Sequence, residues 1–335
     1  MISPLPAAAP LLDLRQVRWH RPLLALAVAM AALTVFCAVA LLVDPRQVTG
    51  LDVWAKPLKF ALSTGVYAVS LSVLIGLLTR FRRTASVAGT IVTVGLAIEL
   101  LLIVWAAAAG TTSHFNVSSA LSTTVFAVMG GTIAVVWLMA LLVAVLLFRN
   151  RLGDPARALA IRAGAVIGAI GMALAFLMTS PTAAQLADFG GIAGAHTVGL
   201  ADGGPGLPIL GWSTVAGDLR IPHFVGMHAL QLLPIAAILL EVLARRIPLL
   251  SDPALRLRLV AVLTVTYAAT VAVVTWQALS GQSIVSPAGA VLLAGSAIGL
   301  ACGVSIAALL GTALLSRRRA AAARPPVENR VPTAV

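Results

Sequence analysis

Three segments of the chain carry most of its histidine and aspartate side chains, the residue types that could support acid–base or metal chemistry. Residues 110–116 contain one histidine, residues 181–221 contain a histidine and three aspartates, and residues 222–231 contain two histidines and a glutamine. Imidazole exchanges a proton near neutral pH and binds transition metals, and a neighbouring carboxylate can fix its orientation. These segments therefore predict either an acid–base site or a site for a transition metal or heme.

Individual roles follow from residue type and position. Catalytic roles are predicted for His114, His223, His228, Asp202, Asp218 and Glu99. Substrate-binding roles are predicted for Lys56, Lys59, Asn116, Trp212, Arg220 and Gln231. A metal ion would use His114, His196 and His228, since a helix turns by roughly 140° over the five residues that separate His223 from His228. Each histidine taken singly is also explained as an interfacial residue, and Asn116 as the N-cap of the next helix.

Two glutamates lie within long apolar segments. Glu99 stands past the middle of its segment, where an ionisable side chain is costly and is usually retained for a role. We expect Glu99 to face the protein interior, with Lys56 and Lys59 as candidate partners; the alternative is a carboxyl that is protonated or hydrogen-bonded to nearby threonines. Glu241 lies near the end of its segment, and Arg245 four residues later predicts a local ion pair.

The elements that position these side chains are membrane-spanning helices. Hydrophobic residues make up 60% of the 335 and charged residues 10%, with a mean hydropathy of +1.03, far from the composition of a soluble domain. A helix needs about 20 apolar residues to cross a bilayer. Eight segments qualify: 22–43, 56–79, 85–109, 117–148, 158–180, 222–244, 258–279 and 287–315. The sequence therefore predicts an all-α polytopic membrane protein, with Cys37 and Cys302 inside apolar runs as inert small side chains.

The basic residues give the predicted orientation. Five arginine clusters contain 19 of the 23 basic residues and fall on one side of the membrane if there are eight spans. Positive residues favour the cytoplasmic side, so both termini are predicted to be cytoplasmic, in a bacterial inner membrane, with the three polar segments outside. This placement explains the net charge of +12 without nucleic-acid binding. The predicted partners are the bilayer and a lipophilic or small-molecule ligand.

Residues 181–221 form the one long connection, and its apolar residues predict a lid over the outer end rather than a solvated linker. A short interfacial helix is expected at 181–189 and a disordered cytoplasmic tail at 320–335. Lys56-Pro57-Leu58-Lys59-Phe60 and Arg220-Ile221-Pro222-His223-Phe224 open the second and sixth spans in the same direction. That echo suggests two four-helix halves within the transmembrane domain of residues 1–319. Small residues four apart, such as Gly164 with Gly168 and Gly295 with Gly299, predict close helix packing.

Trp54-Ala55-Lys56-Pro57-Leu58-Lys59-Phe60 and the run from Asp202 through His228 to Gln231 resemble a family of bacterial eight-helix membrane proteins that has no assigned activity. The likeness covers most of the chain and implies a fold. More remotely, the architecture is similar to that of heme A synthase, which has two four-helix halves and heme-ligand histidines near the outer face. This chain lacks that family's paired histidines on the second and eighth spans. The resemblance therefore implies at most one heme-like site, from His228 with His114 or His196.

Two functions compete on the sequence. The first is a membrane-embedded enzyme, or a heme- or metal-binding redox protein, that acts on a lipophilic substrate at the outer leaflet. The second is a transporter or small-solute carrier, in which Glu99 with Lys56 and Lys59 would relay protons or ions near the midplane. The apolar inner halves of the spans argue against the second. A non-catalytic membrane partner protein would leave the outer polar residues unexplained, and the sequence leaves the reaction, the cofactor and the oligomeric state open.

Overall fold

The computed structural model describes residues 17–322 and is almost entirely helical. Its eight long helices are α1 (Arg21–Val43), α2 (Ala55–Leu77), α3 (Arg82–Ala108), α4 (Ala120–Phe148), α5 (Pro155–Ala173), α7 (Arg220–Leu243), α8 (Pro253–Leu279) and α9 (Gly289–Ala322). Each is long and apolar enough to cross a membrane, α5 together with the short helices that follow it. The chain is therefore an all-α polytopic membrane protein, as predicted.

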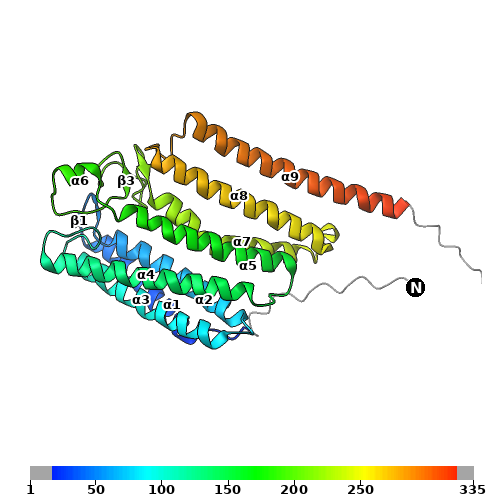
Figure 1. Ribbon diagram of the computed structural model, residues 1–335, viewed down its shortest axis with the longest axis horizontal. Coiled ribbons are helices and arrows are strands. Elements are labelled where there is room, and N and C mark those ends of the chain that lie inside the picture. The colour runs from blue at the N-terminus through cyan, green and yellow to red at the C-terminus, as the bar shows by residue number, and fades with distance from the viewer. Residues whose placement is uncertain (1–16, 323–335) are drawn as a thin grey trace, which may run out of the picture.

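The helices run side by side, so their connections gather at two ends of the bundle (Figure 1). We call one the loop end, formed by residues 44–54, 109–119, 174–219 and 280–288, and the other the arginine end, formed by residues 17–20, 78–81, 149–154 and 244–252. The loop end lies on the left of Figure 1. The three polar segments predicted to form a site therefore meet at one end.

Helix starts follow local capping chemistry. At the arginine end, Asp154 accepts two backbone N–H groups of the first turn of α5 and Asp252 accepts one of α8, and a proline follows each as the first helical residue. At the loop end, α4 starts later than predicted, because Ser119 caps it through the N–H of Ser122. The N-cap interpretation of Asn116 is therefore wrong.

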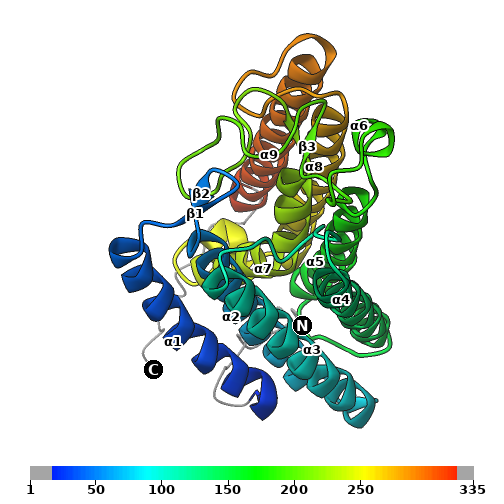
Figure 2. The same cartoon turned by 90° about the vertical axis from the view of Figure 1, so that its left-hand side faces the viewer.

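The helices repeat one pattern of neighbours in each half of the chain. In the first half, α1 packs on α2, α2 on α3, α3 on α4, and α1 also meets α3. In the second half the same four relations hold in order for α5, α7, α8 and α9. Figure 2 shows the two groups, with α4 against α5 at their junction. This repeat is the arrangement expected from two four-helix halves.

Glycines decide how closely α5 and α7 approach. A Cβ added to Gly171 would lie 2.3 Å from backbone atoms of Gly226 and Met227, and one added to Gly164 would lie 2.6 Å from the carbonyl of Ala229. The close packing predicted for the fifth span is therefore confirmed. By contrast, no described atom lies within 4 Å of a Cβ added to Gly295 or Gly299, so these glycines of α9 pack against no other helix within residues 17–322.

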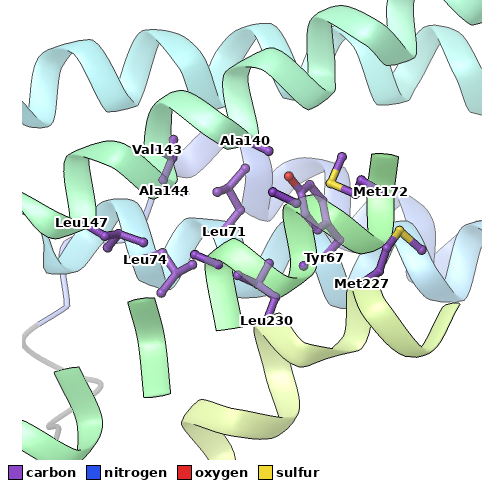
Figure 3. Close-up of a pocket in the computed structure, with 13 residues that line it drawn as sticks. Tyr67, Leu71, Leu74, Ala140, Val143, Ala144, Leu147, Met172, Met227 and Leu230 are labelled. Atoms are coloured by element: carbon purple, nitrogen blue, oxygen red, sulfur yellow. The ribbon is translucent and has the colours of Figure 1, made fainter. Parts of the chain in front are cut away.

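A small apolar cavity marks the junction of the two halves, between α2, α4, α5 and α7. Figure 3 shows Tyr67 of α2 among leucine, alanine, valine and methionine side chains from the other helices. The Tyr67 hydroxyl is buried and has no hydrogen-bond partner among the described residues. The cavity is about 20 Å³, enough for one water molecule but not for a substrate.

Two buried ion pairs hold the second half together at the arginine end. Arg157 on α5 donates to Glu241 on α7 at 2.9 Å, and Arg256 on α8 donates to Asp154 at 2.8 Å. The predicted local pair of Glu241 with Arg245 is therefore wrong. The sequence offered a partner one turn away, but the carboxylate points into the bundle, where an arginine from another helix lies within reach.

At the loop end, the long connection folds over the helix ends. It contains the predicted short helix, now α6 (Ala183–Ala187), capped by a reciprocal Thr182–Gln185 box. It also contains the paired strands β3 (Thr197–Val198) and β4 (Gly217–Asp218). A second small ribbon, β1 (Gln47–Val48) with β2 (Leu51–Asp52), lies against it where Gly50 meets Gly203. The lid prediction for 181–221 is thus matched by a folded layer. At the other end, α9 extends to Ala322, so the predicted tail lies outside the described residues from residue 323 onward.

Candidate functional site

Glu99, His114 and Lys56 form a chain of polar contacts between three segments. Glu99 is 4% exposed and faces the bundle interior, as predicted. Its Oε1 lies 3.6 Å from Nε2 of His114, whose Nδ1 lies 3.0 Å from Nζ of Lys56. Lys56 thus reaches Glu99 through the imidazole rather than directly, a link that the sequence did not reveal.

The protonation of His114 follows from its partners. Nδ1 faces the Lys56 ammonium and the Ser113 hydroxyl, both at 3.0 Å. An ammonium has only donors, so Nδ1 accepts and the ring proton sits on Nε2, toward Glu99. Burial first, and then the charges on Lys56 and His196, hold the pKa of His114 well below its usual value of 6.5. His114 is therefore a neutral link whose two ring nitrogens are both engaged.

His196 and Asp202 form a second pair, within the lid. Nδ1 of His196 lies 2.6 Å from Oδ2 of Asp202, and the same carboxylate accepts the backbone N–H groups of His196 and Thr197. Burial acts to raise the pKa of Asp202, but the hydrogen bonds from His196 and the two N–H groups outweigh it and hold that pKa below its ordinary range. Asp202 is therefore an ionised acceptor, so the His196 ring carries its proton on Nδ1.

The remaining nitrogen of His196 gives the pair its chemistry. With the proton on Nδ1, Nε2 presents a lone pair, and no hydrogen bond to it is found within residues 17–322. The His196 side chain is 25% exposed. Burial lowers the pKa of His196 below 6.5, although the hydrogen bond to Asp202 acts in the opposite direction. A carboxylate that orients an accessible, neutral imidazole is the arrangement of a general base.

Phe115 joins the two polar groups. Its ring centroid lies 6.0 Å from that of His114 and 4.9 Å from that of His196. Phe115 has φ of +64°, a conformation that a bulky side chain rarely adopts, and its carbonyl is fixed by the N–H of Ala193 in the lid. Strained backbone of this kind concentrates at functional sites. Nothing in the sequence indicated a role for Phe115, since a phenylalanine beside a histidine carries no signal of its backbone conformation.

Asp218, Arg220 and Lys59 fasten the lid. The Arg220 guanidinium donates to both carboxylate oxygens of Asp218 and to the carbonyl of Gly211. Lys59 donates to the carbonyl of Leu210 at 2.9 Å. Asp218 is 1% exposed, so its carboxylate is consumed by these contacts and by the N–H of Ser213. Their geometry fits a positioning role for all three residues better than the catalytic role predicted for Asp218.

The two histidines of α7 form no hydrogen bond with the His196–Asp202 pair within residues 17–322. His223 contacts the carbonyl of Gly171 through Nδ1 at 2.8 Å, and His228 contacts the carbonyl of Phe224 in the same way. His228 also stacks on Phe224, with centroids 4.1 Å apart, and Trp212 meets the same ring. Gln231 bonds Ser70 on α2 rather than sharing a ligand with His228. These residues tie helices and lid together.

Asn116, predicted to bind substrate, is turned inward. Its side-chain oxygen accepts from the N–H and hydroxyl of Ser118, and its amide donates to Thr111. Its backbone pairs with Ile192 of the lid as an isolated bridge. Asn116 therefore shapes the 109–119 connection and holds the lid to it.

The predicted three-histidine metal site does not fit this geometry. Within residues 17–322, no three His, Cys, Asp or Glu side chains are grouped so that they could hold a metal ion, so His114, His196 and His228 do not form the predicted set. His114 has no free ring nitrogen for a heme iron. His228 bonds the Phe224 carbonyl through Nδ1 and stacks on the Phe224 ring, and no hydrogen bond to its Nε2 is found among residues 17–322.

Comparison of the chain with protein-family models, with curated proteins and with solved structures finds no match. The account of its function therefore rests on the geometry of its own residues.

Proposed function

We propose that this chain is a membrane-embedded enzyme that performs acid–base chemistry at the loop end, on the polar part of a lipophilic substrate. The observation that carries the proposal is the His196–Asp202 pair at 2.6 Å, with Nε2 of His196 left as a lone-pair acceptor. Asp202 fixes the tautomer and orientation of the imidazole. Nε2 then removes a proton from a substrate hydroxyl or a water molecule and returns it to the leaving group. A positioned general base typically contributes a factor of about 10²–10⁴ in rate.

Lys56, His114 and Glu99 provide the electrostatic setting for that step. Charge that develops at His196 acts through space on His114 and Lys56, while Phe115 packs between the two imidazoles. The pKa of His196 is itself lowered by the charge on Lys56, after larger effects of burial and Arg220. Lys56 keeps the imidazole neutral and ready to accept a proton, while Glu99 stabilises the ammonium through His114.

The lid favours a lipophilic substrate. Leu186, Phe189 and Ile209 are 72%, 57% and 69% exposed, although each is a large apolar side chain. Exposed apolar residues on a layer that covers the ends of membrane helices lie naturally at the bilayer surface. A substrate with an apolar tail would remain in the bilayer while its head reached His196. In line with the distribution of arginines, the loop end would face the exterior of a bacterial inner membrane and both termini the cytoplasm.

The test is turnover of a natural lipid mixture. The purified full-length protein is reconstituted in nanodiscs, supplied with a lipid extract of its expression host's membranes, and the lipids are followed by mass spectrometry. We expect at least one species to be converted, with loss of conversion in His196→Gln and retention in His228→Gln. Conversion that survives His196→Gln, or no conversion of any species by the wild type, would contradict the proposal.

The second candidate, a proton-coupled carrier, is favoured by one observation. Oε2 of Glu99 is buried without a hydrogen-bond partner among the described residues, so this carboxyl has capacity to take up a proton. However, the cavity at the junction of the two halves is lined by apolar side chains apart from Tyr67, so it offers no polar route for a proton. Proteoliposomes that acidify under an imposed ion gradient, and that lose this flux in Glu99→Gln, would favour the carrier over the enzyme.

A further inference from the structure

A polar pocket lies at the arginine end, remote from the loop-end site. It has a volume of about 280 Å³ and is bounded by the start of α1, by Ile75 of α2 and by the first turns of α3. Its lining residues are Trp19, His20, Arg21, Pro22, Ile75, Arg82, Ser86 and Thr90. A water molecule occupies about 30 Å³, so the pocket admits a group of several atoms.

Two arginine side chains give this pocket a positive charge. Arg21 and Arg82 line it, and within residues 17–322 neither forms a salt bridge with a carboxylate. Arg82 donates to the carbonyl of Arg18 at 2.9 Å, which anchors its guanidinium beside the pocket. Two guanidinium groups without carboxylate partners in the described part of the chain form a binding place for an anion, because their fork of donors matches phosphate oxygens.

The other lining groups suit the same ligand. Ser86 and Thr90 stand one turn apart on α3. The Thr90 hydroxyl contacts the Ser86 carbonyl at 3.1 Å and Nε2 of His20 at 3.4 Å, whereas no hydrogen bond of the Ser86 hydroxyl is found among residues 17–322. The His20 imidazole is uncharged, because Nε2 donates to the Ser86 carbonyl at 2.9 Å and Nδ1 accepts the N–H of Leu23. Burial first, opposed by the bond to Ser86, lowers the pKa of His20. His20 therefore joins α1 to α3 and shapes the pocket without adding charge.

The position of the pocket favours a lipid headgroup over a free anion as its ligand. α1 begins at Arg21 and crosses the membrane, so its first turn lies at the level of lipid headgroups. Trp19 is a residue type enriched at that level. Farther along α1, Val28 and Val35 are 71% and 65% exposed and offer an apolar face to acyl chains. Basic pockets between membrane helices bind anionic lipid headgroups.

We propose that this pocket binds the phosphate group of an anionic phospholipid, with Arg21 and Arg82 as the cationic ligands and Ser86 as a hydroxyl ligand. The site is independent of the loop-end chemistry. It would fix α1 against α3 in membranes that contain such lipids.

Native mass spectrometry of the full-length protein with phosphatidylglycerol or phosphatidylcholine tests the proposal. Each arginine near a membrane surface contributes roughly fivefold to the binding of an anionic lipid. The double variant Arg21→Gln/Arg82→Gln should therefore retain phosphatidylglycerol roughly thirtyfold less well. The matched control is Arg80→Gln/Arg83→Gln, which removes the same charge at the same end from residues outside the pocket lining. Thr90→Phe should also weaken retention, by filling the pocket without a change of charge.

Three outcomes would overturn the lipid assignment. Equal losses in the two double variants would mean general charge attraction rather than a built site. Equal retention of phosphatidylglycerol and phosphatidylcholine would mean that the pocket does not bind the anionic headgroup specifically. Displacement of the lipid by millimolar inorganic phosphate would mean a site for a free anion.

Discussion

Replacing Glu99 with leucine tests the buried polar chain at the loop end. The substitution removes the carboxylate that lies 3.6 Å from Nε2 of His114 and leaves the Lys56 ammonium with only neutral partners in its chain. Removing one partner of a buried ionic group typically costs about 3–5 kcal/mol. Glu99→Gln keeps a polar amide beside His114 and loses only the charge, so a smaller cost of about 1–2 kcal/mol is expected.

Thermal unfolding of the purified protein in detergent measures the difference. At roughly 2–4 °C per kcal/mol for a protein of this size, Glu99→Leu should lower the Tm by on the order of 10 °C and Glu99→Gln by a few degrees. Adding Lys56→Met to Glu99→Leu should recover much of the loss, since no uncompensated charge then remains. A single Glu99→Leu variant as stable as the wild type, or additive losses in the double variant, would refute the reasoning.

Three further predictions follow from the same contacts. As the pH falls from 7.5 to 5.5, the protein should lose up to about 1.4 kcal/mol of stability per pH unit for each of His114 and His196. The reason is that folding lowers the pKa of both residues, so the unfolded chain takes up protons first. The Tm, measured across this range, should fall less steeply with pH in His114→Asn than in the wild type. Gly171→Ala should cost about 3 kcal/mol or more, since its Cβ would meet the backbone of α7, whereas the matched Gly190→Ala, with open space around it, should change the Tm little. Asp154→Asn should keep the cap of α5 and lose the ion pair with Arg256, while Asp154→Ala should lose both and unfold with about 1 kcal/mol less stability than Asp154→Asn; equal Tm values for the two variants would contradict the capping role.

The helices and their order were predictable because membrane spans depend on composition and length alone. Each of the eight predicted segments contains a helix of the structure, with ends that differ by a few residues where capping decides them. The start of α4 is an example: both Asn116 and Ser119 can cap a helix, and only the path of the connection selects Ser119. The inward position of Glu99 was also predictable, from the cost of a carboxylate facing lipid.

The pairing of the site residues was not predictable, since it depends on contacts between distant segments. His114 reaches Glu99 across 15 residues, and its selection over His223 or His228 depends on the left-handed turn at Phe115. A catalytic role for Asp202 was predicted, but the three polar segments hold seven aspartate and histidine side chains, which allow many pairings. The ion pair of Glu241 with Arg157 was not predictable for the same reason: 84 residues separate the two side chains in the sequence.

The pH dependence of lipid turnover by the wild type and by Asp202→Asn tests the proposed role of His196 most directly. The neutral imidazole is the active form, so wild-type kcat/KM should be constant at neutral pH and fall only as the pH drops below about 6.5, where His196 begins to take up a proton. Asp202 acts to raise the pKa of His196 and fixes its tautomer. Asp202→Asn should therefore lower kcat/KM at every pH and move the acidic limb to lower pH. A profile that is identical in the two proteins would contradict the account.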